Sequence, residues 1–387
     1  MKSLKIRNVS IVSGTNISQQ VDSESKTDIL ILNGKIAQIG HQLKTPIDCD
    51  NLDADGWIAT PGWIDIQLNG AFGFDFTENP DTIWQAAEEL PKLGTTSFLP
   101  TIITSPLEVI SKAIETLKKG PPAGFKGANA LGLHLEGPFL NPLKKGAHNP
   151  KYLLKPNPDL VQEWTHSNGV LLVTLASELD EDFQTIRRLR DQGVVVSIGH
   201  SLASYEQARS AFQNGIQCGT HLFNAQTGIE HRAPGLSIAL LTSREVYTGI
   251  IIDGIHAHRA MINLAWSCKG SQRFITVTDA ISALGMPPGK YNLGEFEINV
   301  TETKVTLNDG TLAGSNITQQ KSLRNLMAWT GCSLYEALGT VTTTPSELLK
   351  LPNKGGITPG ADADLVLVDS DINIKATVVG GKILYRN

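Results

Sequence analysis

Short apolar runs recur along the middle of the chain, and each ends in polar or glycine residues before a segment with helical spacing. The runs occupy residues 58–69, 96–102, 130–137, 170–176, 194–200, 218–224, 247–254 and 274–280. Spacers such as 180–193 and 205–215 end at a glycine, which commonly stops a helix. Eight strand–helix units of this kind predict an α/β fold, a (β/α)₈ barrel of the TIM type.

The two ends of the chain follow a different pattern, because both contain short alternating strands. Residues 1–55 include the hairpin signal Asn33-Gly34, and residues 353–387 alternate in the same way. We therefore expect both termini to form one small β-sandwich domain beside a barrel of residues 56–352. A further hairpin insertion is predicted near 289–314, after the eighth run.

Composition narrows the class of protein. The 387 residues are 41% hydrophobic and 18% charged, with a formal net charge of −5, as in a soluble globular protein of about two domains. No basic surface points to nucleic acid, and no apolar run is long enough for a membrane helix. The scattered cysteines and the N-terminus without a signal peptide predict a cytoplasmic protein with reduced thiols.

Polar residues at the strand ends are the candidate catalytic and metal-binding residues, because the carboxyl ends of barrel strands converge on one mouth. They are Gln67, Asn69, Glu136, His200, His221, His256 and Asp279. Two imidazoles and a carboxylate leave one metal position open, as in catalytic divalent sites. A single histidine at a strand end is more often a hydrogen-bonded structural residue. Together, on strands three, five and six, Glu136, His200 and His221 favour a metal site.

Asp279 and His134 show how position separates two roles. Asp279 ends the eighth run and would act as a general base beside an activated water, although an aspartate at such a junction also often caps a helix. The neighbouring metal ligands favour catalysis. His134 lies two residues before Glu136 on the same face, so we place it deeper in the barrel as a core residue.

Two loops complete the predicted mouth. Residues 137–150 form a long, proline-containing loop with Lys144, Lys145 and His148, which suits a segment over the substrate. Residues 224–235 offer backbone amides near Asn224 and Ala225, together with Arg232. Amides beside an arginine can bind a phosphate even in a protein of net negative charge.

Several strings, in their order along the chain, resemble the N-acetylglucosamine-6-phosphate deacetylases, a family in the amidohydrolase superfamily. They are "HLEGPFL", "SIGHS", "GTHLFNA", "DGIHAH", "VTDAISALG" and "LAGS", and the resemblance runs from "TPGWIDIQLNG" through "PGADADLVLVD". It implies hydrolysis of N-acetylglucosamine 6-phosphate to glucosamine 6-phosphate and acetate, in amino-sugar metabolism.

The resemblance also implies roles for single residues. Glu136, His200 and His221 would hold the metal, with Asp279 as the catalytic carboxylate and His148 stabilising the oxyanion. Arg232 would reach the phosphate bound by the neighbouring subunit of a homodimer. The remaining contacts to the sugar phosphate or acetyl group would come from Gln67, Asn69, His148, Asn224, Ala225 and His256.

The stretch "TPGWIDIQLNG" bears on the number of metals. Asp65, Gln67 and Asn69 share one face of a strand, and the two amides stand where the superfamily has Asp-x-His-x-His. Neutral amides are weak ligands for a borderline metal, so we predict one divalent ion per chain. Zn²⁺ is the first choice, and the same donors also suit Fe²⁺, Co²⁺ or Mn²⁺.

Other functions are less compatible with these residues. Cyclic-amide hydrolases commonly use two metals bridged by a carboxylated lysine at the end of strand four, but that run reads "LLVTLASE". Deaminases usually retain His-x-His on strand one. A non-catalytic binding protein on the same scaffold is the alternative from another class. Such a protein would have no reason to retain Glu136, both histidines and Asp279.

Overall fold

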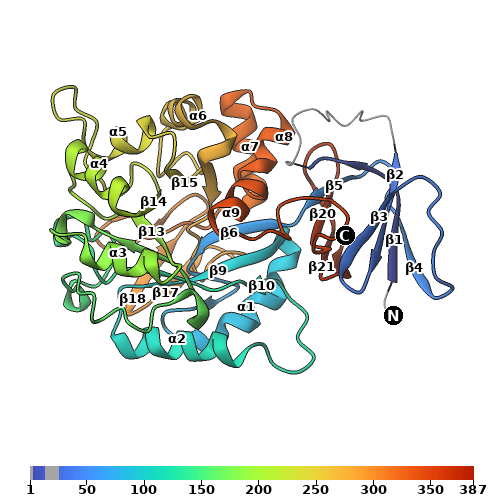
Figure 1. Cartoon of the computed structure of the whole chain (residues 1–387), viewed down its shortest axis with the longest axis horizontal. Helices are drawn as coiled ribbons and strands as arrows, with labels where there is room; N and C mark the ends of the chain where they lie inside the picture. The colour runs from blue at the N-terminus through green and yellow to red at the C-terminus, as the bar shows by residue number, and fades with distance from the viewer. Residues whose placement is uncertain (1–2, 14–25) are drawn as a thin grey trace.

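The structure, a computed structural model, describes residues 3–13 and 26–387. Figure 1 shows two parts, a barrel surrounded by helices and a smaller β domain that contains strands from both ends of the chain. The predicted fold class is confirmed. In the described residues all four cysteines are free, and no helix combines the length and apolar character needed to cross a membrane.

Within residues 26–387, eight parallel strands form the barrel. They are β6 (Trp63–Leu68), β9 (Thr95–Ile103), β11 (Leu133–Glu136), β12 (Val170–Leu175), β13 (Val195–Ile198), β14 (Ile216–Gly219), β15 (Tyr247–Ile251) and β16 (Phe274–Val277). The short β10 (Asn129–Ala130) extends the pairing along β9. A parallel bridge between Leu68 and Ala280 joins the last strand to the first, which closes the barrel.

Helices and short turns of 3₁₀ helix cover the outside of the barrel. The α-helices are α1 (Ile83–Glu89), α2 (Leu107–Lys119), α3 (Gln184–Asp191), α4 (Tyr205–Asn214), α5 (Gly235–Thr242), α6 (Arg259–Arg273), α7 (Gln319–Thr330), α8 (Leu334–Gly339) and α9 (Thr343–Leu348). The 3₁₀ helices are η1 (Pro80–Thr82), η2 (Leu90–Leu93), η3 (Pro142–Lys144), η4 (Pro150–Tyr152), η5 (His166–Asn168) and η6 (Ser177–Leu179). Helix α4 begins with a capping box between Ser204 and Gln207 and ends before Gly215, close to the predicted spacer.

The predicted first run, residues 58–69, is divided between two sheets. Strand β5 (Ile58–Pro61) pairs with β1 (Ser3–Ile11) and β20 (Leu365–Val368) in the terminal domain, whereas β6 belongs to the barrel. Gly62 lies at the crossing, where a Cβ atom would come within 2.2 Å of Thr96 Oγ1. Because the chains approach so closely there, a residue with a side chain would not fit where the run passes from one sheet to the other.

The remaining strands of the terminal domain come from both ends of the chain. They are β2 (Thr27–Leu32), β3 (Lys35–Gly40), β4 (Cys49–Asp53), β21 (Ile374–Val379) and β22 (Lys382–Arg386). Strand β1 pairs with β4 through its first half and with β5 through its last residues, so it links two sheets. A separate apolar core, which includes Ile6 and Leu365, lies between these sheets. This arrangement fits the predicted sandwich.

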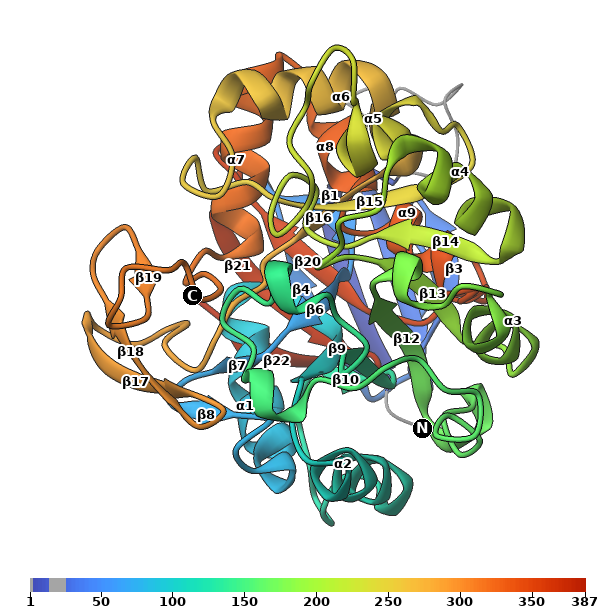
Figure 2. The same cartoon turned by 90° about the vertical axis from the view of Figure 1, so that its left-hand side faces the viewer.

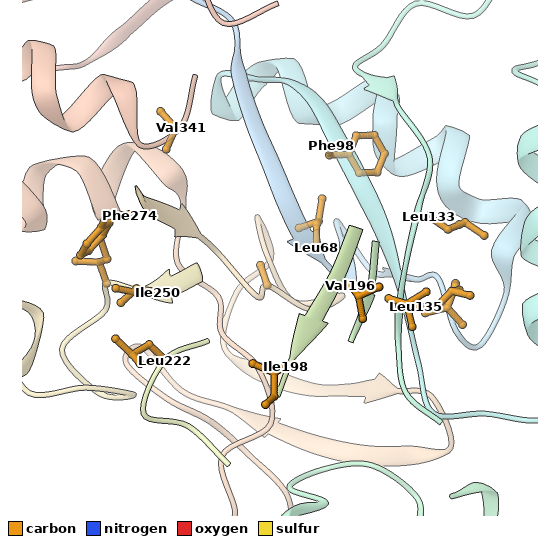
Figure 3. Packing of buried hydrophobic residues seen from close by; sticks show 14 of the residues in the cluster. Leu68, Phe98, Leu133, Leu135, Val196, Ile198, Leu222, Ile250, Phe274 and Val341 are labelled. Atoms are coloured by element: carbon orange, nitrogen blue, oxygen red, sulfur yellow. The ribbon is translucent and has the colours of Figure 1, made fainter. Parts of the chain in front are cut away.

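Alternation along the strands separates the core from the site. Leu133 and Leu135 of β11 pack outward in the main apolar cluster with Val196 and Ile198 of β13 (Figure 3). Their neighbours His134, Glu136 and Ser197 therefore face the barrel interior. Packing of one face of each strand against the helices thus fixes which polar side chains reach the mouth.

The predicted hairpin insertion is present as β17 (Gly289–Leu293), β18 (Phe296–Val300) and β19 (Val305–Thr306). Figure 2 views the barrel from the side away from the terminal domain and shows these strands at one flank. The short pair β7 (Gly70–Ala71) and β8 (Phe74–Asp75) lies at the end of the first barrel strand. Ile298 and Val300 pack on Ile103 and Ile281 in a cluster that joins the insertion to the barrel rim.

Candidate active site

Three side chains predicted as ligands converge at the mouth of the barrel. Glu136 is the last residue of β11, and His200 and His221 each lie two residues past the end of β13 and β14. Both histidines have left-handed backbones, with φ of 48° and 31°. Such a conformation costs about 1–3 kcal/mol in a non-glycine residue and is characteristic of functional sites. Here it turns each imidazole from the strand end into the mouth.

The ligand atoms are close enough to share one cation. Glu136 Oε1 lies 2.9 Å from His221 Nε2 and 3.3 Å from His200 Nε2, and the two Nε2 atoms are 3.0 Å apart. Metal bonds of about 2.0–2.1 Å in tetrahedral geometry would place neighbouring ligand atoms about 3.3 Å apart. The observed separations are of that size, so the donor set fits a small divalent ion.

The hydrogen bond on the far side of His200 supports the same conclusion. Its Nδ1 lies 2.7 Å from the carbonyl oxygen of Lys144, which can only accept, so Nδ1 carries the proton. Its other nitrogen, Nε2, faces the Glu136 carboxylate. Burial opposes ionisation of Glu136, but its contacts with the two histidines hold its pKa well below the usual range. An imidazole that donates from Nδ1 to a backbone carbonyl and directs Nε2 at a carboxylate has the arrangement usual for metal-binding histidines.

His148 also lies at this centre but carries its proton differently. It offers a ring nitrogen within 4.8 Å of ligand atoms of Glu136 and His200, so it is a geometric candidate for a ligand. The backbone amide of Thr104, which can only donate, lies 3.3 Å from His148 Nδ1, and the Thr104 hydroxyl, which can also donate, lies 2.9 Å from the same nitrogen. Nε2 therefore carries the proton, and burial lowers the pKa of His148 to about 3. His148 is thus a neutral hydrogen-bond donor, and His221 is the better third ligand.

Asp279 lies two residues past the end of β16 and lines the same cavity. It is 9% exposed, and its φ of 49° again indicates a left-handed backbone. Burial and then the negative charge of Glu136 raise the pKa of Asp279 to about 6. A carboxylate with a raised pKa can both accept and return a proton near neutral pH. It does not cap a helix, since the chain continues into a turn at residues 282–285.

The two amides of the first strand have separate partners. Gln67 Nε2 donates to Glu136 Oε1 at 3.1 Å, whereas Asn69 Nδ2 donates to Asp279 Oδ1 at 2.8 Å. Each amide therefore orients one of the two carboxylates. Asn69 also lines the cavity, but Gln67 lies beneath it against the metal cluster. The two positions expected to contact substrate thus hydrogen-bond the candidate metal ligand Glu136 and the candidate base Asp279.

A cavity of about 370 Å³ lies above these groups. Among the other predicted contacts, it is lined by Asn224, Ala225 and His256. His256 Nδ1 donates to Asp253 at 2.6 Å, which fixes the ring. Arg232 is exposed and does not line the cavity of its own chain. The deeper His134 hydrogen-bonds Thr101 and Thr174, as expected for a core residue.

Comparison with known proteins identifies the family. The model of the amidohydrolase family matches residues 58–384. The N-acetylglucosamine-6-phosphate deacetylase of Lysinibacillus sphaericus is 34% identical over 384 residues, which cover 98% of this chain and 97% of that protein. The chain belongs to the N-acetylglucosamine-6-phosphate deacetylase family of amidohydrolases.

Solved structures of this family have the same fold. The N-acetylglucosamine-6-phosphate deacetylase from Pasteurella multocida superposes with a TM-score of 0.90 at 31% identity, with all of both chains covered. A mutant of the Mycobacterium smegmatis enzyme in complex with N-acetyl-D-glucosamine-6-phosphate has a TM-score of 0.88 at 29% identity. That match covers 99% of this chain and 100% of the other.

The family assignment agrees with details of the fourth strand. Strand β12 contains no lysine, so it cannot supply the bridging group of two-metal relatives. Instead Glu178, just past this strand, accepts hydrogen bonds from Ser201 Oγ and the Leu202 amide, both at 2.6 Å. It thereby holds the turn that follows His200. A carboxylate at this position supports the ligand loop.

The sequence did not reveal the groups that determine which ring nitrogen of each active-site histidine carries the proton. Thr104 and the Lys144 carbonyl determine which nitrogen of His148 and His200 carries the proton, and Asp253 does so for His256. The first two come from loops that approach the site only after folding, and backbone groups have no signature in the sequence. Asp253 was accessible in principle, because it lies three residues before His256.

Proposed function

We propose that the chain deacetylates N-acetylglucosamine 6-phosphate, which yields glucosamine 6-phosphate and acetate. The observation that carries this proposal is Asp279 beside the Glu136–His200–His221 cluster, at the base of one cavity. The names of the family members supply the substrate. We infer a single divalent ion per chain, with Zn²⁺ as the first choice because two imidazoles and a carboxylate suit it.

Different residues carry out the separate steps of amide hydrolysis. When bound, the metal would polarise the acetyl carbonyl and lower the pKa of the attacking water. Asp279, oriented by Asn69, accepts the proton of this water as the water attacks the carbonyl carbon. The same carboxyl then passes the proton to the sugar nitrogen, so that a neutral amine leaves when the C–N bond breaks. Without that proton the leaving group would be an amide anion, which is far too basic.

We propose that His148 is the oxyanion donor, because it lines the cavity beside Glu136 and His200. Its Nε2 proton, assigned from the Thr104 contact, is available to the negative oxygen that develops during attack. Because the pKa of His148 is lowered by burial, the ring stays neutral and does not compete with the cation for Glu136. We infer that His148 stabilises the tetrahedral state and is not a metal ligand.

The opposite side of the cavity suits the phosphate. The amide of Ala225 donates no hydrogen bond within the described residues, and Ala225 lines the cavity, as Asn224 and His256 do. Burial favours the neutral form of Asp253, but its contacts with His256 lower its pKa, and the His256 ring is held by its hydrogen bond to this carboxylate. A free backbone amide and a fixed imidazole at the cavity wall are suitable contacts for a phosphate group.

We propose that Arg232 completes the phosphate site from a second copy of the chain in a homodimer. Its side chain is exposed, makes no hydrogen bond or ion pair within the described residues, and lies in the loop that follows Ala225. The proposed sugar-phosphate substrate is charged and does not cross membranes freely, so we assign the reaction to the cytoplasm.

Acetate release tests the proposed reaction and the role of Arg232 together. We expect the wild-type protein to release acetate from N-acetylglucosamine 6-phosphate with a much higher kcat/KM than from N-acetylglucosamine. Arg232→Ala should reduce this preference by about tenfold or more, the value of a charge-assisted contact. Arg244→Ala, another exposed arginine, is the matched control. An unchanged preference in Arg232→Ala would remove the arginine from the phosphate site, and no acetate from wild type would reject the reaction.

A further inference from the structure

The loop of residues 141–152 supplies two groups to the metal centre. The carbonyl of Lys144 accepts the Nδ1 proton of His200, and His148 lies against His200 with ring centroids 4.4 Å apart. The loop contains only short 3₁₀ turns, η3 and η4, so its own backbone does not hold it rigidly. Its position must therefore be set by contacts with other segments.

Each end of this loop is tied to a different element. At its start, Asn141 Nδ2 donates to Glu178 at 2.9 Å. At its end, Asn149 Nδ2 and the Tyr152 hydroxyl each donate to one carboxylate oxygen of Glu295, both at 2.8 Å. Within the described residues, these are the side-chain hydrogen bonds that connect residues 149–152 to another element. Glu295 is thus the anchor of the second end.

The position of Glu295 is fixed by the β17–β18 hairpin. It occupies the two-residue turn of the β17–β18 hairpin, where Leu293 pairs with Phe296 and Gly294 has a φ of +56°. Glycine at the first position of such a turn matches the twist of the strands. The Gly294 amide donates to the buried Asp75 at 3.2 Å, so the tip is fixed to the barrel rim. Leu293 itself lines the active-site cavity.

The orientation of Asn149 is also determined. Its Oδ1 caps η4 by accepting from the Lys151 amide at 3.0 Å, which leaves Nδ2 to face Glu295. A glutamine at position 295 could keep both contacts without the charge, because its oxygen can accept from Asn149 while its amide donates to the Tyr152 oxygen. Glu295→Gln therefore removes the charge, and Tyr152→Phe removes one contact.

We propose that Glu295 is a positioning residue for the deacetylation, and this inference rests on the proposed function. By holding Asn149 and Tyr152, it keeps His148 and the Lys144 carbonyl directed at the metal cluster. The hairpin insertion thereby acts as one half of the active-site roof, and the 141–152 loop is the other. Both contacts lie at the surface of the protein.

The test compares Glu295→Ala, Glu295→Gln and Tyr152→Phe with Glu297→Gln. Glu297 is a matched control because it is exposed, lies on the same hairpin and pairs with Lys290 instead of the loop. Trypsin cleavage after Lys144 and Lys145 in the metal-loaded protein reports loop position, and transfer of metal to a chelator reports the support of His200. Both measurements are independent of substrate, so they stand even if the proposed reaction fails.

We expect Glu295→Ala to be cleaved in the loop and to lose metal several-fold faster than wild type. Its kcat should fall by roughly tenfold, with a smaller change in KM, because two contacts to a charged group are lost. Glu295→Gln and Tyr152→Phe should lie between, and Glu297→Gln should match wild type. If Glu295→Ala does not fold, Tyr152→Phe still tests the contact. Wild-type cleavage and metal-release rates in the folded variants would overturn the proposal.

Discussion

Asp279→Asn is expected to lower kcat by at least ~10²-fold, the lower end of the range for general acid–base catalysis. Asparagine has nearly the same shape and can still accept the hydrogen bond from Asn69 that now reaches Asp279 Oδ1 at 2.8 Å. It cannot take the proton of the attacking water or return one to the leaving nitrogen. The fold and the metal content should therefore remain, and only turnover should be lost.

The wild-type pH profile provides a second measure of the same role. Asp279 must be ionised to act as the base, so kcat/KM should fall as pH drops through its pKa. Burial and the charge of Glu136 raise that pKa to about 6, and a bound cation would offset the second contribution. We expect the acid limb at or below about pH 6, and its absence from the residual activity of Asp279→Asn. Near-wild-type turnover by that variant would remove Asp279 from the mechanism.

His221→Gln is expected to lose the metal and, with it, ~10³-fold or more of the activity, since metal ions contribute several kcal/mol to such reactions. His221 Nε2 lies 2.9 Å from Glu136 and 3.0 Å from His200, so it completes the donor set. A neutral amide at this position is a weak ligand. Elemental analysis after dialysis, together with acetate release, measures both effects.

His134→Gln is the matched control for this variant. His134 is also a buried barrel histidine, but it hydrogen-bonds Thr174 at 2.8 Å and lies deeper than the cluster. We expect the variant to keep its metal, even if its melting temperature falls. Retention of a full equivalent of metal by His221→Gln, or its loss from His134→Gln alone, would assign the ligands differently.

The arrangement of the barrel follows from alternation that is visible in the sequence. Because Leu133 and Leu135 must pack outward, Glu136 must face inward, and the same logic applies to the ends of β13, β14 and β16. The predicted sixth run, residues 218–224, extends beyond its strand, because β14 ends at Gly219 and His221 lies in the turn that follows. Strand and turn could not be separated there, since residues 220–224 are as apolar as the strand.

Contacts between distant loops could not be predicted in this way. The sequence shows that Gln67 and Asn69 are poor metal ligands, but only the folded chain shows that they orient Glu136 and Asp279. Likewise, Glu295 is 146 residues from Asn149, and nothing in either segment indicates that they meet. Such pairings depend on how loops pack after the barrel has formed, which local patterns do not encode.

The central claim is that one divalent ion, held by Glu136, His200 and His221, supports deacetylation by Asp279. Titration of chelator-stripped protein with Zn²⁺, while acetate release from N-acetylglucosamine 6-phosphate is followed, tests it most directly. We predict no activity without metal and a linear rise that ends at one equivalent per chain. Full activity without metal, or a rise that continues to two tightly bound equivalents, would contradict the account.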